Sequence, residues 1–169
     1  ETDLAKGRIC IKAGNYTMDV GNSGIKAFYT DSISGGSYTI HSTDDAVQAA
    51  TVMVYGGEFT VESGDEGFNA KAAMYLRGGS ATITKSSKPF VSTSVMAVSG
   101  GSWFGLGGGY VETMVPTEAS VYTVASELPA EIASGAVVTI ENASGTTIYS
   151  AVAGKKISSI YASSADFSA

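Results

Sequence analysis

The sequence predicts an all-β protein in which the chain winds into a solenoid of coils, each about 21–22 residues long. Three observations predict this fold. A pair of glycines returns every 21 or 22 residues, apolar and polar residues alternate around each pair, and no part of the repeat has the 3.6-residue period of a helix. A β unit this short buries its apolar face only by stacking on copies of itself.

The glycine pairs divide the first two thirds of the chain into equal units. Successive pairs are separated by 21, 22 and 22 residues, and Ala13-Gly14 lies 22 residues before the first pair. A tight bend often requires a positive φ and the absence of a Cβ atom, so we expect each pair to form a corner of a coil. The pairs are Gly35-Gly36, Gly56-Gly57, Gly78-Gly79 and Gly100-Gly101.

Alignment on the glycine pairs predicts three short strands in every coil. The residues two and four positions before each pair are apolar, apart from Asp31, and their neighbours are mixed, which is the period of a strand with one face buried. The same alternation follows each pair, and a third short apolar stretch comes later in the unit. The inward columns begin with Ile11, Ile33, Val54, Leu76 and Val98 before the pair, with Tyr16, Tyr38, Phe59, Ala81 and Trp103 after it, and with Ile25, Val47, Phe68 and Phe90 in the third stretch.

The repeat is lost near residue 110, which divides the chain into parallel β-helix coils over 1–109 and a C-terminal β-rich cap or side module over 110–169. Strands are predicted at 120–124, 136–141 and 146–152, and the turn at 142–145 predicts a hairpin between the last two. Such a module would cover the open end of the last coil.

The first coil shows no cap of its own. Residues upstream of Glu1 would cover it, or coils of another molecule would stack on it and give end-to-end filaments.

Composition excludes several classes of function. The 169 residues carry a net charge of −6 without any run of Lys or Arg, so nucleic acid is not an expected partner. No apolar stretch reaches the ~18–20 residues of a membrane span. Cys10 is the single cysteine, so neither an intrachain disulfide nor a zinc site of Cys and His is expected.

Acidic residues recur in the turn between the second and third strands. Stacking of the coils would place Asp44 and Asp65 ~4.8 Å apart, where two charges repel by roughly 3–4 kcal/mol at an effective dielectric of 20. Ca²⁺ takes 6–8 oxygen ligands and would neutralise them. The alternative is a solvated turn screened by salt. The expected calcium ligands are Asn22, Asp44, Asp45, Asp65 and Glu66, and the site should stop at Ser87 and Lys88 in the next coil.

Outward-facing columns of the coils predict a surface for sugars. Lys12 and Arg77 share the column of Tyr55, and Tyr75 lies on an adjacent coil. Aromatic rings and a guanidinium would bind an anionic polysaccharide by stacking and by bidentate contacts to a carboxylate. Two alternatives stay open: these residues are simply good strand formers, or a sugar carboxylate binds through the metal at the acidic turn.

The sequence does not predict an enzyme. The acidic pairs of the turns are sequence neighbours without a distant partner cluster, whereas inverting hydrolysis needs two carboxylates ~6.5–9.5 Å apart across the substrate. The single histidine, His41, lies in an outward column beside Asp19 and Glu62, as a surface residue would.

The repeated pattern Gly-Gly-x-aromatic-Thr-Ile/Val, followed by Ser-Gly-Asp-Glu-Gly-Phe-Asn-Ala at 63–70, resembles secreted bacterial carbohydrate-binding proteins of the right-handed parallel β-helix type. The resemblance covers 13–104 well and 120–169 more loosely, and residues 154–168 are similar to the C-terminal segment of that family. It implies calcium at Asp44, Asp45, Asp65 and Glu66, and weakly at Asn22. It also implies binding of plant cell-wall polysaccharides, acidic pectin-type chains and cellulose among them, outside the cell or at its surface.

The sequence therefore predicts a secreted or surface-exposed β-helix that binds polysaccharide and Ca²⁺ without catalysing a reaction. The alternative is a structural adhesin or a self-assembling extracellular filament subunit, because composition does not separate the two.

Overall fold

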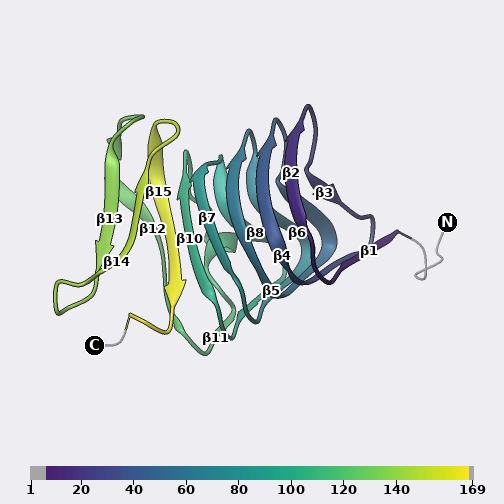
Figure 1. The fold of residues 1–169 in the computed structure, drawn as a ribbon. Helices are drawn as coiled ribbons and strands as arrows, with labels where there is room; N and C mark the ends of the chain where they lie inside the picture. Colours follow the sequence, from purple (N-terminus) through teal and green to yellow (C-terminus); the bar gives the residue numbers. More distant parts are fainter. Residues whose placement is uncertain (1–6, 168–169) are drawn as a thin grey trace.

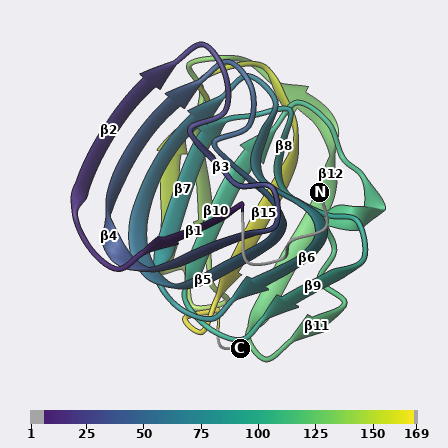
Figure 2. The ribbon, with the colours of Figure 1, turned by 90° about the vertical axis from the view of Figure 1, so that its right-hand side faces the viewer.

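The chain forms a right-handed β-solenoid closed by an antiparallel cap, as Figures 1 and 2 show. The computed structural model describes residues 7–167. In Figure 2, seen from the N-terminal end, the chain runs clockwise as it recedes from the viewer, which makes the solenoid right-handed. Within the described residues, the sole helical element is the short 3₁₀ helix η1 (Glu112–Met114). The predicted fold class is confirmed.

Each coil contributes strands to three parallel ladders. We call these ladders the pre-glycine face, the post-glycine face and the third face, according to their place relative to the glycine pair. β4 and β5 are long because they continue through a glycine corner from one face to the next. The strands are β1 (Arg8–Ile11), β2 (Asn15–Val20), β3 (Ile25–Lys26), β4 (Thr30–Ser42), β5 (Val47–Ser63), β6 (Glu66–Leu76), β7 (Ser80–Lys85), β8 (Lys88–Ser92), β9 (Val95–Val98) and β10 (Ser102–Gly107).

The glycine pair at each corner has two separate tasks. A Cβ atom on Gly56 would lie 2.7 Å from the carbonyl oxygen of Ser34 in the preceding coil, so only glycine allows the coils to stack this closely. Gly57 adopts a φ of +113°, which residues with a side chain rarely adopt. The corners at the other three pairs repeat both features. The predicted role of the glycine pairs is confirmed.

Apolar columns fill the interior as predicted. The rings of Tyr16, Tyr38 and Phe59 stack along the axis with centroids 5.1 and 4.4 Å apart. Tyr38 is buried, and its hydroxyl donates a hydrogen bond of 2.6 Å to the carbonyl oxygen of Gly35 at the corner. The buried polar tip thus finds a partner, as burial of a tyrosine requires.

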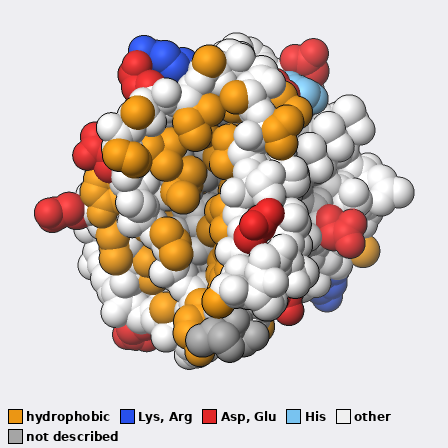
Figure 3. All heavy atoms as spheres, turned by 90° about the vertical axis from the view of Figure 1, so that its left-hand side faces the viewer, with side chains coloured by type: hydrophobic (Ala, Val, Ile, Leu, Met, Phe, Trp, Pro, Cys, Tyr) orange, Lys and Arg blue, Asp and Glu red, His pale blue; other side chains and the backbone are white. Residues whose placement is uncertain are grey.

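The C-terminal part covers the last coil with antiparallel strands. β15 (Ile157–Ser164) pairs with β10 on one side and with β12 (Tyr122–Ile132) on the other. β13 (Val137–Glu141) and β14 (Thr147–Val152) form the predicted hairpin, whereas β15 lay outside the three predicted strand runs. A second apolar cluster, which includes Phe104 and Ile157, holds the cap on β10. Figure 3 shows that the outer side of this cap carries many apolar side chains.

Parallel pairing extends beyond the predicted boundary at residue 110. β11 (Glu118–Ala119) adds to the pre-glycine face next to β9, so the chain completes part of a further coil before it enters the cap. The division into 1–109 and 110–169 stays a prediction.

Asp31 is a buried acid in an apolar column. Its ladder partners are Ile9 and Val52, its side chain is fully buried, and neither carboxyl oxygen has a hydrogen-bond partner. Burial raises the pKa of Asp31 to about 7. An ionised carboxylate in this position destabilises the folded state because nothing replaces its hydration.

We expect Asp31→Val to stabilise the protein, and more so at pH 8.5 than at pH 5. Between the usual pKa of an aspartate and the raised one, the folded chain holds a proton that the unfolded chain releases, so wild-type stability falls as the pH rises through this range. Each pKa unit corresponds to about 1.4 kcal/mol. Urea unfolding at the two pH values measures the difference, and an equal gain at both would contradict the assignment.

Candidate functional site

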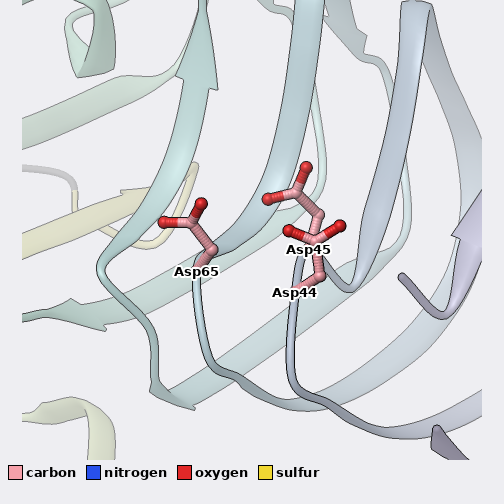
Figure 4. Close-up of side chains that lie close together, drawn as sticks. All are labelled: Asp44, Asp45 and Asp65. Atoms are coloured by element: carbon pink, nitrogen blue, oxygen red, sulfur yellow. The ribbon is translucent and has the colours of Figure 1, made fainter. Parts of the chain in front are cut away.

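Three carboxylates meet where two acidic turns stack. Asp44 and Asp45 lie on the turn between β4 and β5, and Asp65 lies on the next turn, between β5 and β6 (Figure 4). One oxygen of each carboxylate lies within 4.8 Å of the others. Among residues 7–167, this is the one group of three or more acidic, histidine or cysteine side chains close enough to hold a metal ion. The predicted stacking of Asp44 on Asp65 is thus observed.

Asp45 ties its coil to the following one. Its side chain is buried; Oδ1 accepts a hydrogen bond of 3.0 Å from the backbone N–H of Glu66, and Oδ2 accepts one of 2.9 Å from the amide of Asn69. Oδ2 also accepts a hydrogen bond from the amide of Gln48. A carboxylate has about four lone-pair positions, so roughly one remains for a metal ion.

Gln48 and Asn69 are not among the site residues that the sequence predicts. They are ladder partners on the third face, and both are polar amides that follow an acidic turn by a few residues. That pattern could have indicated that the buried carboxylate would find its donors on the third face.

The two other predicted ligands have different partners. Glu66 forms an ion pair of 3.1 Å with Lys88 and accepts a hydrogen bond of 3.2 Å from Asn69. Asn22 accepts a hydrogen bond of 2.8 Å from the backbone N–H of Ser23, whose hydroxyl donates to Asp44 at 2.8 Å. Glu66 is therefore already neutralised on one side, and Asn22 is linked to the triad through Ser23. Ligation by any of the five residues stays a prediction.

The electrostatics of the triad favour a bound cation. Burial raises the pKa of Asp65, and the neighbouring charges of Glu66 and, more weakly, Asp44 raise it further, while Lys88 lowers it. Lys26 lies 3.9 Å from Asp44, but both side chains are substantially exposed, so this ion pair is weak. Every donor atom in the triad is a carboxylate oxygen, which is the ligand that a hard divalent cation prefers. The residues present fit such a cation.

A second cluster lies on the outside of the pre-glycine face. The guanidinium carbon of Arg77 is 5.4 Å from the ring centroid of Tyr55 and 5.4 Å from that of Tyr75. Both distances are within the range of a cation–π contact. We call these three residues the Arg77 cluster. Lys12 is exposed two coils away in the same column, so the structure brings together three of the four predicted sugar-binding residues.

His41 lies on the outside of the post-glycine face, as expected. Its ladder partners are Asp19 and Glu62, and its Nδ1 is 3.7 Å from a carboxylate oxygen of Glu62. Both side chains are nearly half exposed, at 49% and 42%. The pair is an ordinary surface contact rather than a buried acid–base arrangement.

These features define a β-solenoid with an acidic turn and an aromatic–arginine cluster on its surface. The model of one family matches residues 4–159, and its members are described as carbohydrate-binding domain-containing proteins. The chain belongs to this family. Comparisons with curated proteins and with solved structures each found no match. No helix in the described part of the chain is long and apolar enough to cross a membrane.

We expect Asp45→Ala to destabilise the protein even when no metal is available. The substitution leaves the buried amide of Asn69 and the N–H of Glu66 without this acceptor, and hydrogen bonds to a charged group contribute about 1.5–3 kcal/mol each. Urea unfolding in EDTA should show a loss of about 3 kcal/mol. Asp44→Ala is the matched control, because it removes a half-buried carboxylate from the same turn. A loss below ~0.5 kcal/mol for Asp45→Ala would contradict the structural role.

Proposed function

We propose that this protein is a non-catalytic module that binds an extracellular polysaccharide, an acidic pectin-type chain or cellulose, with Ca²⁺ at its acidic turns. The observation that carries the proposal is the Arg77 cluster on the surface of a chain that belongs to a carbohydrate-binding domain family. The module would act outside the cell or at its surface.

The Arg77 cluster has the chemistry of a sugar-binding surface. Tyr55 is 44% exposed and offers a ring face for stacking. Arg77 is exposed, and among the described residues no carboxylate forms an ion pair with it, so its N–H groups remain available to a ligand. A guanidinium held over aromatic rings is already oriented, which lowers the entropic cost of gripping a sugar carboxylate. Lys12 would extend this surface by two coils.

Calcium is the cation that the acidic turn fits best. Asp44 and Asp65 would be its direct ligands, with Asp45 using its remaining lone pair, while Asn22 and Glu66 would complete the oxygen set. A bound cation would supply positive charge that cancels the repulsion between the two turns. Bound Ca²⁺ can also keep positions for a ligand carboxylate, which makes it a second contact for an acidic sugar.

The arrangement of the acids supports a non-catalytic role. The three carboxylates of the triad are packed into one turn stack, and Asp45 is committed to holding the coils together. Hydrolysis of a sugar chain needs two carboxylates on opposite sides of the scissile bond.

Removal of the guanidinium should weaken sugar binding. We expect Arg77→Ala to lower the affinity for oligogalacturonate at least tenfold, measured by isothermal titration calorimetry, because the variant loses a charge-assisted bidentate contact. Arg77→Lys keeps the charge but not the fork and should recover only part of the affinity. Lys156→Gln is a control, since Lys156 pairs with Glu131 on the cap. Unchanged binding by Arg77→Ala would contradict the role of this cluster.

Calcium should raise the melting temperature of the protein above its value in EDTA, because a ligand that binds only the folded state stabilises it. The double variant Asp44→Asn/Asp65→Asn should lose this response, while its stability in EDTA stays equal to or above that of wild type, since two repelling charges are gone. Differential scanning calorimetry measures both values. A calcium response that persists in the double variant would exclude the acidic turn as the site.

A structural role in an adhesin or filament is the second candidate. Among residues 7–167, β1 and β2 each pair with β4 alone, and coils of another molecule would pair with their other edges in such a filament. At the opposite end, Val124, Val137 and Val152 are about half exposed or more on the cap. Concentration-dependent oligomers by analytical ultracentrifugation, together with no binding of polysaccharide, would favour this alternative.

A further inference from the structure

A groove lies at the corner where the third face turns into the pre-glycine face, next to the acidic turn, which two of its lining residues, Lys26 and Gln48, contact. It encloses about 550 Å³, and its floor and walls are mostly apolar. It is lined by Ala50, by Phe28 and Tyr29 from the preceding coil and by Lys71 from the following coil. A volume of this size falls within the range of small-ligand sites.

The groove exists because one coil is a residue shorter than its neighbours at this corner. The strand registers pair Ile25 with Val47 but Thr30 with Thr51, so the earlier coil has one more residue here. The following coil also has one residue more than the short coil at this corner, since Ala49 pairs with Ala70 but Thr51 pairs with Ala73. The missing residue accounts for the interval of 21 between the first two glycine pairs. The short corner is therefore recessed between two longer ones.

The side chains around the recess combine aromatic rings with positive charge. Phe28 is 73% exposed, and its ring packs edge-to-face on Tyr29 with centroids 4.7 Å apart. Lys26 and Lys71 line the groove from two different coils, and no acidic side chain lines it, although Lys26 also forms the weak ion pair of 3.9 Å with Asp44 in the neighbouring acidic turn. The lysines are two coils apart along the axis, or roughly 10 Å. Two ammonium groups at one recess are notable in a chain with a net charge of −6.

Gln48 adds an oriented polar group to the groove wall. Its amide nitrogen donates to the buried Asp45, so the side-chain conformation is fixed from the core side. This leaves the amide oxygen of Gln48 as an acceptor for a hydroxyl group. An exposed ring, an oriented amide and paired cations together match a sugar unit that carries a carboxylate.

The groove borders the pre-glycine face, which carries the Arg77 cluster. Ala50 precedes the pre-glycine stretch of β5, and Tyr55 ends it five residues later, which corresponds to about 17 Å along a strand. One extended chain lying along the strand direction would reach both.

We propose that this corner groove is a second saccharide subsite, which binds an acidic sugar unit of the same chain that contacts the Arg77 cluster. Lys26 and Lys71 bind the carboxylate, the ring of Phe28 stacks on the sugar, and Gln48 accepts a hydrogen bond from a hydroxyl. This inference rests on the proposed polysaccharide-binding function. It adds a second binding position on the surface and a preference for negatively charged sugar units.

The test is titration of oligogalacturonate and of a neutral cello-oligosaccharide of equal length into wild type and variants, in EDTA, by calorimetry. Lys26→Gln/Lys71→Gln should weaken binding of oligogalacturonate at least tenfold, while binding of the neutral chain changes less than twofold. Lys155→Gln/Lys156→Gln removes the same charge from the cap and should change neither by more than twofold. Phe28→Ala should weaken both ligands, and the exposure of this ring makes the variant safe for folding, which circular dichroism checks.

Amide chemical shifts in ¹⁵N-labelled wild type distinguish failure of the groove subsite from failure of the polysaccharide-binding function. The groove subsite predicts ligand-induced shifts at Gln48 and Ala50 in addition to Tyr55 and Arg77. Shifts confined to the Arg77 cluster, with groove variants that bind like the cap control, would overturn the groove while the proposed function stands. If wild type binds neither sugar, the polysaccharide function and the groove subsite both fall.

Discussion

The close contact between glycine corners is the constraint on which the rest of the structure depends. At each corner a carbonyl oxygen of the preceding coil lies 2.5–2.7 Å from where a Cβ atom on the first glycine of the pair would be, so any other residue would push the coils apart. This contact holds successive coils at the ladder spacing of ~4.8 Å over all three faces. Equivalent residues then meet one above the other, and the stacked rings of Tyr16, Tyr38 and Phe59 show the result inside the core.

The same stacking brings like charges together on the surface, and the protein handles them in three ways. Asp45 is buried and accepts three hydrogen bonds from N–H donors, Glu66 is paired with Lys88, and Asp44 and Asp65 face each other with little compensation. The first two arrangements hold the turns in place, and the third creates a position with affinity for a cation. One turn thus combines a structural acid with acids that are available to a ligand.

The strand columns could be predicted from the sequence because a repeat of fixed length converts sequence spacing directly into strand register. For the same reason, the sequence identifies Asp31 as the exception in an inward column. The fixed repeat length also predicts the stacking of Asp44 on Asp65. The amides that follow the acidic turns indicate donors on the third face, but spacing alone does not show which side chains reach Asp45, because that depends on side-chain conformation. β15 escaped prediction because it belongs to no repeat and pairs antiparallel. The groove follows from one coil being a residue shorter than its neighbours. The sequence shows this as an interval of 21 between the first two glycine pairs, but it does not show at which corner the residue is missing.

The antiparallel cap has a consequence for the order in which the chain folds. Contacts between neighbouring coils join residues about one repeat apart, so each new coil closes a short loop on a template that already exists. Docking of β15 on β10 instead joins residues such as Trp103 and Ser163, which are separated in sequence by β12 and the hairpin. Long sequence separations slow folding, so we expect the solenoid to assemble first and the cap to dock last. During that interval β10 is an unprotected edge, which makes slow docking of the cap the stage at which the chain is most exposed to misassembly.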